Sequence, residues 1–145
     1  MRLNETFEKF GWPHTKVIEL DHWGIMVRPA QPVLGAFVLA CKQPVTAFSD
    51  IDQDGFRELQ EATKAIETML KAAVDYEKIN YLMLMMVDPH VHFHVLPRYS
   101  GTRTWQEIQF NDDGWPGQPD LGKAEKLTLE QQQDMVAFLR NHNST

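Results

Sequence analysis

The stretch DPHVHFHVLPRY, residues 88–99, places three of the six histidines of the chain at every second position. Successive side chains of a β-strand point to opposite faces, so His90, His92 and His94 are expected on one face and the apolar residues between them on the other. A row of three imidazoles makes a poor dry core. The apolar face should therefore pack on the core, while the histidine face meets solvent, a ligand or a polar cleft.

Outward from this stretch, short apolar runs bounded by turn residues predict further strands. These runs are residues 16–20, 23–29, 33–41 and 79–87, and the histidine strand itself covers 91–97. The fourth run contains the methionine-rich segment YLMLMMV, residues 81–87. We interpret this segment as a buried strand rather than as a flexible methionine surface.

Two segments have the period of a helix. Apolar residues recur at steps of three and four from Phe56 to Ala73, and the acidic SDIDQD before them, residues 49–54, supplies N-cap candidates. A second helix is expected to begin at Thr128, where Gln131 completes a capping box. Strands in a run, one long helix, more strands and a short helix indicate an α+β fold with an antiparallel sheet. We expect a single domain over residues 1–145, because this length is typical of one domain.

Composition narrows the classes of function. The net charge of -6 argues against a protein that grips a nucleic-acid polymer, although a small nucleotide needs only a few local donors. The apolar run at residues 81–87 is far shorter than the ~20 residues of a membrane-spanning helix, so no membrane association is expected. Cys41 is the only cysteine and the polar start lacks the apolar segment of a signal peptide, so we expect a cytoplasmic protein.

The spacing of the histidines bears on a metal site. At ~3.3 Å per residue, neighbouring histidines stand about 6.7 Å apart and the outer pair about 13 Å apart. Tetrahedral zinc needs ligand nitrogens at about 2.0–2.1 Å, so one ion is a poor fit to all three. A metalloprotein that uses two of the three histidines with a ligand from elsewhere stays open as an alternative, as does a surface strand that is merely rich in histidine.

Nucleophilic catalysis suits the pattern better. An imidazole can attack phosphorus when one ring nitrogen keeps a fixed proton and the other presents its lone pair. The middle residue, His92, would attack, and a backbone carbonyl of the strand could hold its proton. The flanking histidines could then donate hydrogen bonds to an anion whose charge must be stabilised in the transition state.

The letters HVHFHVL, residues 90–96, resemble the signature of the histidine triad (HIT) superfamily, in which three histidines alternate with apolar residues. The following Pro97 and Arg98 resemble the fragile-histidine-triad, or dinucleoside polyphosphate hydrolase, branch. Residues 34–51 are similar to the second-hairpin strand of the family and its lead into the long helix. The resemblance implies a sheet of about five antiparallel strands with a long helix packed on it and a C-terminal helix. It also implies a homodimer that joins two sheets.

By the same resemblance, His92 would be the nucleophile that attacks the α-phosphorus of a nucleoside phosphate derivative. The substrate would be a dinucleoside polyphosphate or a phosphoramidate, cleaved through a nucleotidyl-histidine intermediate by a hydrolase or nucleotidyl transferase. His90 would hold the tautomer of His92 through its backbone carbonyl, and His94 would bind phosphate oxygens. No cofactor is expected to be required, although a divalent metal ion could accompany the substrate phosphates.

Beyond the triad, Arg28, Met26 and Arg98 are expected to contact the nucleotide; Arg28 stands where relatives place an asparagine for the ribose. Other positions depart from the family pattern. Met-Met-Val-Asp at residues 85–88 precedes the triad where many relatives carry a polar residue that contacts phosphate, and Ala36 stands where they often have a further histidine. The nucleophile is present while part of its polar surroundings is missing. A nucleotide-binding protein with little turnover is therefore the alternative to a hydrolase.

Overall fold

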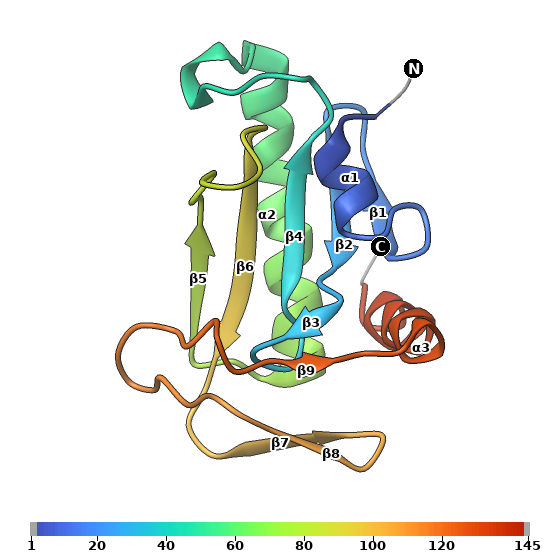
Figure 1. Ribbon diagram of the computed structural model, residues 1–145, viewed down its shortest axis with the longest axis vertical. Helices are drawn as coiled ribbons and strands as arrows, with labels where there is room; N and C mark the ends of the chain where they lie inside the picture. Colours follow the sequence, from blue (N-terminus) through green and yellow to red (C-terminus); the bar gives the residue numbers. More distant parts are fainter. Residues whose placement is uncertain (1–2, 144–145) are drawn as a thin grey trace.

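The computed structural model describes residues 3–143 and centres on a five-stranded antiparallel sheet (Figure 1). The strand order is β1-β2-β4-β6-β5. The strands are β1 Lys16–Glu19, β2 Trp23–Val27, β4 Phe37–Cys41, β5 Lys78–Leu82 and β6 His92–Arg98. The predicted α+β fold with about five antiparallel strands is confirmed.

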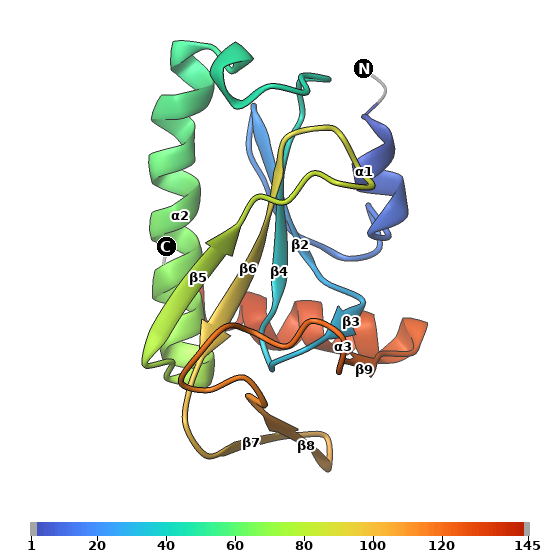
Figure 2. The ribbon, with the colours of Figure 1, turned by 60° about the vertical axis from the view of Figure 1, so that its left-hand side comes forward.

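Helices lie on both faces of this sheet. The long helix α2, Gln53–Val74, covers one face and contacts α3, Leu129–Arg140, whereas the short helix α1, Glu5–Lys9, lies on the other face (Figure 2). As predicted, Asp52 caps α2, its side chain accepting the backbone N–H of Gly55 at 2.8 Å, and the capping box at the start of α3 is formed. Among the described residues, no helix is long and apolar enough to cross a membrane.

Side chains of the central strands alternate between the two faces of the sheet and contribute to an apolar cluster on each face. Ile25, Leu39 and Val95 belong to the main core on the α2 side. Met26 and Val38 belong to a smaller cluster that packs with α1 on the opposite side. Strands β2 and β4 are buried throughout, which explains why their sequences read as continuous apolar runs rather than as an alternation.

Several short elements were not foreseen from the sequence. Besides α1, they are η1 Phe48–Asp50, the pair formed by β3 Ala30–Gln31 and β9 Glu125–Lys126, and the hairpin of β7 Thr102–Trp105 and β8 Ile108–Asn111. Each is too short to give a periodic signal of its own. The β3–β9 pair and the hairpin lie at the opposite end of the sheet from the start of β6 (Figure 1).

The interpretation of residues 81–87 as a buried strand is wrong. Strand β5 ends at Leu82, and beyond it the side chains of Met86 and Val87 are 88% and 83% exposed. The chain leaves the sheet after Leu82, and within the loop that follows Met85 has a φ of 50°, in the left-handed region. An apolar run has no feature that distinguishes a buried strand from a loop, so the sequence could not reveal this turn.

Candidate active site

Two of the three triad histidines lie side by side on strand β6, on the face of the sheet that carries α1. In the register with β4, His92 lies opposite Ala40 and His94 opposite Val38. Their ring centroids are 5.2 Å apart. The alternation predicted from the sequence therefore holds for this pair, and the residues facing them across the ladder are small.

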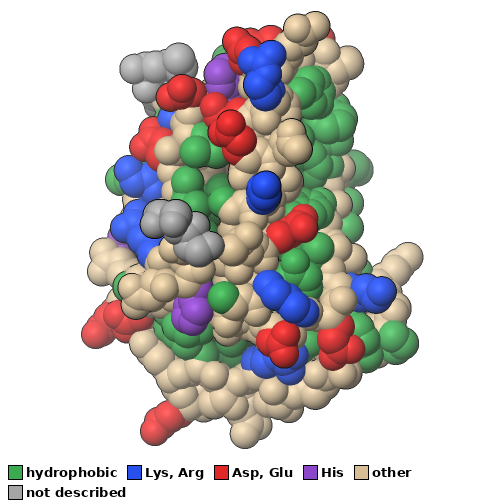
Figure 3. Space-filling model, turned by 180° about the vertical axis from the view of Figure 1, so that it is seen from behind, with side chains coloured by type: hydrophobic (Ala, Val, Ile, Leu, Met, Phe, Trp, Pro, Cys, Tyr) green, Lys and Arg blue, Asp and Glu red, His purple; other side chains and the backbone are tan. Residues whose placement is uncertain are grey.

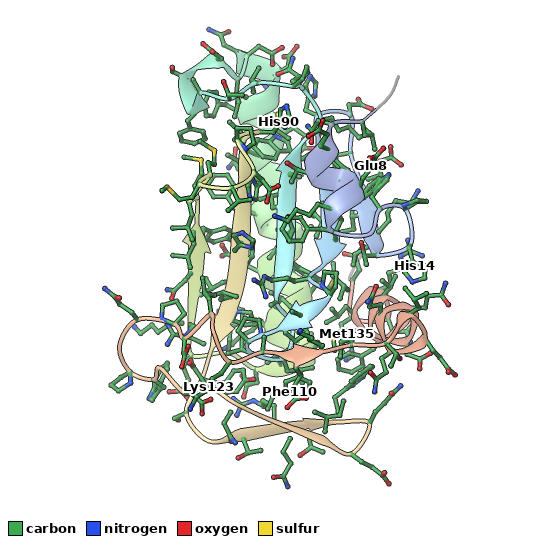
Figure 4. All side chains as sticks on the ribbon, in the orientation of Figure 1. Glu8, His14, His90, Phe110, Lys123 and Met135 are labelled. Atoms are coloured by element: carbon green, nitrogen blue, oxygen red, sulfur yellow. The ribbon has the colours of Figure 1, made fainter. Side chains whose placement is uncertain are left out.

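The first histidine of the triad lies just before the strand and contributes its backbone. The carbonyl oxygen of His90 is 2.7 Å from Nδ1 of His92. Because a carbonyl can only accept, Nδ1 of His92 carries the proton and its Nε2 presents a lone pair. The ring of His90 has a different environment: its buried Nδ1 has no hydrogen-bond partner among residues 3–143. Figure 4 shows His90 at the end of the sheet where β6 begins, beside α1.

A cavity of about 260 Å³ lies against His92 and His94. Its walls come from α1 and the residue after it, from the end of β2, from the loop between β5 and β6, and from β6 itself. The lining residues are Lys9, Phe10, Arg28, Leu84, Met85, Met86, Val87, Asp88, His92 and His94. The volume is close to the lower end of the range of ~300–1,000 Å³ for small-molecule sites.

Arg28 and His94 lie together in the lining of this cavity. Nε of Arg28 donates to Nδ1 of His94 at 3.4 Å. Burial, followed by the nearby Arg28 charge, lowers the pKa of His94 to about 4, so this imidazole is neutral at pH 7. With Nδ1 accepting from Arg28, the proton of neutral His94 resides on Nε2. Arg28 and His94 can therefore both donate hydrogen bonds to an anion.

The N-terminal segment contributes Lys9 and Phe10 to the lining of the cavity. Nζ of Lys9 is 2.7 Å from Oδ2 of Asp88, which joins α1 to the loop before the triad. The ring of Phe10 meets that of His94 edge to face, with centroids 5.6 Å apart. Sequence reasoning missed both Lys9 and Phe10. The only local signal was Asn4, whose side chain caps α1 by accepting the backbone N–H of Thr6.

The structure places two expected nucleotide contacts outside the cavity. Met26 shares the triad face but is fully buried, in a cluster with Phe7 of α1. Arg98 is 4% exposed and donates from Nε and Nη2 to the two carboxylate oxygens of Asp112 at 2.6 and 3.0 Å. It also donates to the side chain of Asn80. Of the three residues expected to join the triad, only Arg28 lines the cavity.

The metal alternative gains no support from the geometry. Over residues 3–143, no group of three or more histidine, cysteine, aspartate or glutamate side chains is arranged to hold a metal ion. Nδ1 of His92 donates to a backbone carbonyl, and Nδ1 of His94 accepts from Arg28, so neither nitrogen is available to a metal ion. The Nε2 atoms remain for a ligand.

An imidazole with a fixed tautomer, beside a neutral histidine and a half-buried arginine, defines a site suited to an anionic phosphoryl group. The family comparison agrees with this class. Residues 11–101 match the model of the HIT domain family, which is more than half of the chain, and the chain belongs to that family. The resemblance to the superfamily is thereby confirmed, while the dinucleoside polyphosphate hydrolase branch stays a prediction.

Solved structures share the fold. A histidine triad protein from Sinorhizobium meliloti has a TM-score of 0.75 at 22% identity, over 97% of this chain and 96% of that one. A zinc-bound histidine triad family protein from Mycobacterium smegmatis has a TM-score of 0.58 at 14% identity, over 90% and 84%. The Plasmodium falciparum diadenosine triphosphate hydrolase, in complex with cyclomarin A, has a TM-score of 0.65 at 11% identity, over 94% and 92%.

Proposed function

We propose that the protein is a HIT-type nucleotide hydrolase or nucleotidyl transferase that attacks the α-phosphorus of a nucleoside phosphate derivative through Nε2 of His92. The observation that carries this proposal is the 2.7 Å contact between Nδ1 of His92 and the carbonyl of His90. It fixes the proton of the neutral imidazole on Nδ1 and leaves the lone pair of Nε2 for attack without a separate base. The fold is shared with a diadenosine triphosphate hydrolase, which adds support for phosphoric anhydrides as one substrate class.

The chemistry is a double displacement. The lone pair of Nε2 forms a P–N bond as the bond from phosphorus to the leaving group breaks, and the leaving group departs with the electron pair and takes up a proton. Water then attacks the nucleotidyl-histidine, the P–N bond breaks, and a nucleoside monophosphate is released with His92 restored. An alcohol or amine in place of water would make the same reaction a transfer.

Arg28 and His94 supply the stabilisation that this route requires. Charge on the phosphoryl oxygens must be held while the P–N bond forms, and preorganised donors in a partly dry site do this at low cost. The Arg28 guanidinium carries a fixed positive charge, and neutral His94 donates from Nε2. These steps use only side chains of the protein, so we propose that turnover needs no cofactor. Dialysis against a chelator should leave the rate unchanged.

A nucleotide-binding protein with little turnover is the second candidate. The loop before the triad favours it, because Met85 and Met86 line the cavity where many relatives carry polar residues. Incubation with dinucleoside polyphosphates and nucleoside phosphoramidates separates the two. Release of nucleoside monophosphate, together with a nucleotidyl adduct on the intact protein by mass spectrometry, supports the hydrolase. Micromolar binding of a mononucleotide with no turnover of either substrate would favour the binding protein.

We propose further that residues 1–145 act as one domain and that two copies form a homodimer through β5, as the family resemblance implies. Strand β5 ends the order of the sheet, so its outer edge is free among the described residues. Such an edge can pair with a second strand. Figure 3 shows hydrophobic side chains along the flank that carries β5 in Figure 1. Light scattering should give twice the mass of one chain, and the mass of a single chain would contradict the dimer.

A further inference from the structure

One wall of the cavity is apolar and open to solvent. It consists of four consecutive residues of the β5–β6 loop, Leu84, Met85, Met86 and Val87. Leu84, Met86 and Val87 are 52%, 88% and 83% exposed, which places them among the large exposed hydrophobic residues of the described chain. Contiguous apolar surface beside a cavity is typical of a binding surface rather than of a folding requirement.

The backbone holds this wall in a strained shape. Met85 has a φ of 50°, in a region that is unfavourable for a residue other than glycine. Conformations of this kind persist where surrounding contacts impose them, and they cluster at ligand-binding segments. In Figure 2 the loop leans away from the sheet toward α1. The ion pair of Asp88 with Lys9 holds its far end there.

The net charge of the residues that line the cavity limits the charge of a ligand that can bind beside this apolar wall. Lys9 and Asp88 neutralise each other, whereas Arg28 has no carboxylate partner among residues 3–143. His94 adds no charge at pH 7 because its pKa is lowered to about 4. The lining side chains thus offer one uncompensated positive charge. This matches the single negative charge of a phosphate diester or phosphoramidate, whereas the several charges of a polyphosphate chain would lie unpaired against methionine and valine.

We propose that residues 84–87 form a leaving-group subsite that selects nucleoside phosphates whose single phosphate carries an apolar alkyl or aryl group. Such substrates would be preferred over those whose leaving group is a further phosphate chain. This inference rests on the proposed function of His92. In the step concerned, the P–O or P–N bond to the apolar group breaks as Nε2 attacks. The group then leaves along the loop as an alcohol or amine after taking up one proton.

The test compares three substrates: an unsubstituted adenosine phosphoramidate, its arylalkyl amide and diadenosine triphosphate. For the unaltered protein, kcat/KM should be highest for the arylalkyl amide, by about tenfold over each of the others. The Met86→Asn and Val87→Asn variants replace apolar side chains by polar ones without adding charge. They should lose most of this advantage, so that kcat/KM for the arylalkyl amide falls to about that for the unsubstituted amidate. Both residues are highly exposed, so the fold should tolerate the change. Leu129→Asn, at an exposed leucine outside the cavity, is the matched control and should change nothing.

The outcomes separate the two levels of the proposal. Turnover of all three substrates with no preference for the arylalkyl amide, or with a preference that the loop variants leave intact, overturns the leaving-group subsite while His92 catalysis stands. A higher kcat/KM for diadenosine triphosphate does the same. No turnover of any substrate overturns the proposed hydrolase and, with it, the subsite.

Discussion

Lys9 and Asp88 form an ion pair with an Nζ–Oδ2 distance of 2.7 Å that joins the first helix to the loop before the triad. The pair lies in the lining of the cavity, so its cancellation of charge is felt by any anion that binds there. This contact links residues 79 positions apart.

Removing the Asp88 charge should therefore change substrate preference. Asp88→Asn frees the Lys9 ammonium and raises the positive charge of the cavity by one. We expect kcat/KM for diadenosine triphosphate to rise by up to about tenfold, ~1.4 kcal/mol, relative to that for a phosphoramidate. Asp54→Asn, at an exposed aspartate far from the cavity, is the control and should leave the ratio unchanged. An unchanged ratio in Asp88→Asn would show that Lys9 remains unavailable to phosphate.

Alanine variants of His92 and His90 should differ sharply in their rate of turnover. His92→Ala removes the nucleophile and should abolish turnover while nucleotide binding stays within about tenfold, ~1.4 kcal/mol. His90→Ala keeps the backbone carbonyl that holds Nδ1 of His92, so kcat should fall by less than about tenfold. Steady-state kinetics and calorimetric binding check both. A near-normal rate for His92→Ala would refute the mechanism, and complete loss in a folded His90→Ala would assign a role to the His90 ring.

The sequence predicted the α+β fold and the placement of His92 and His94 on one face of a strand, because both depend on local patterns. Alternation around His92 gave the strand and its two faces, and the capping box at Thr128 gave the start of the last helix. Arg28 came from the family resemblance and lines the cavity. Strand β6 begins at His92 rather than at residue 91, which leaves His90 outside the ladder.

What the sequence missed depends on contacts between distant segments. Lys9 and Phe10 reach the triad only because α1 folds over the sheet, and helix α1 of five residues has no periodicity to read. Arg98 follows the triad in sequence, yet its partner Asp112 is 14 residues further on and fixes it away from the cavity. The methionine run failed as a strand for the same reason: whether it is paired depends on the partner strand, not on its own composition.

The buried ion pair of Arg98 and Asp112 should matter for stability and not for catalysis. The two side chains are 4% and 2% exposed, so Asp112→Ala leaves an uncompensated buried guanidinium and should lower the free energy of unfolding by about 3–5 kcal/mol. Urea denaturation measures this loss. Asp54→Ala breaks the exposed pair with Arg57 and should cost less than about 1 kcal/mol. A loss below about 1 kcal/mol for Asp112→Ala would show that water reaches Arg98.

A double variant tests whether the Arg98–Asp112 pair is dispensable for catalysis without destabilising the fold. Arg98→Met with Asp112→Leu replaces the pair by apolar groups of similar size and should recover most of the stability. Because Arg98 does not line the cavity, the double variant should bind nucleotide and turn it over as the unaltered protein does. A large loss of binding in this folded variant would return Arg98 to the nucleotide site that the sequence suggested.

The half-buried imidazole of His94 should make the free energy of unfolding fall as the solution is acidified. Its pKa is about 4 in the folded protein against 6.5 for an unperturbed histidine, so between these pH values the unfolded chain binds a proton that the folded protein does not. Stability from this group is complete above pH 6.5 and is lost as pH falls toward 4. Since His94 is only half-buried, we expect about 1–2 kcal/mol to be lost between pH 7.5 and 5.

Urea denaturation of the unaltered protein and of His94→Gln at the two pH values isolates this contribution. His22 acts in the opposite sense, because its hydrogen bond to Glu58 raises its pKa and stabilises the fold as pH falls. That effect is common to both proteins and cancels in the comparison. The unaltered protein should lose more stability than His94→Gln on acidification. Equal losses would mean that water reaches His94 freely, in which case the Arg28 charge would be screened from it as well.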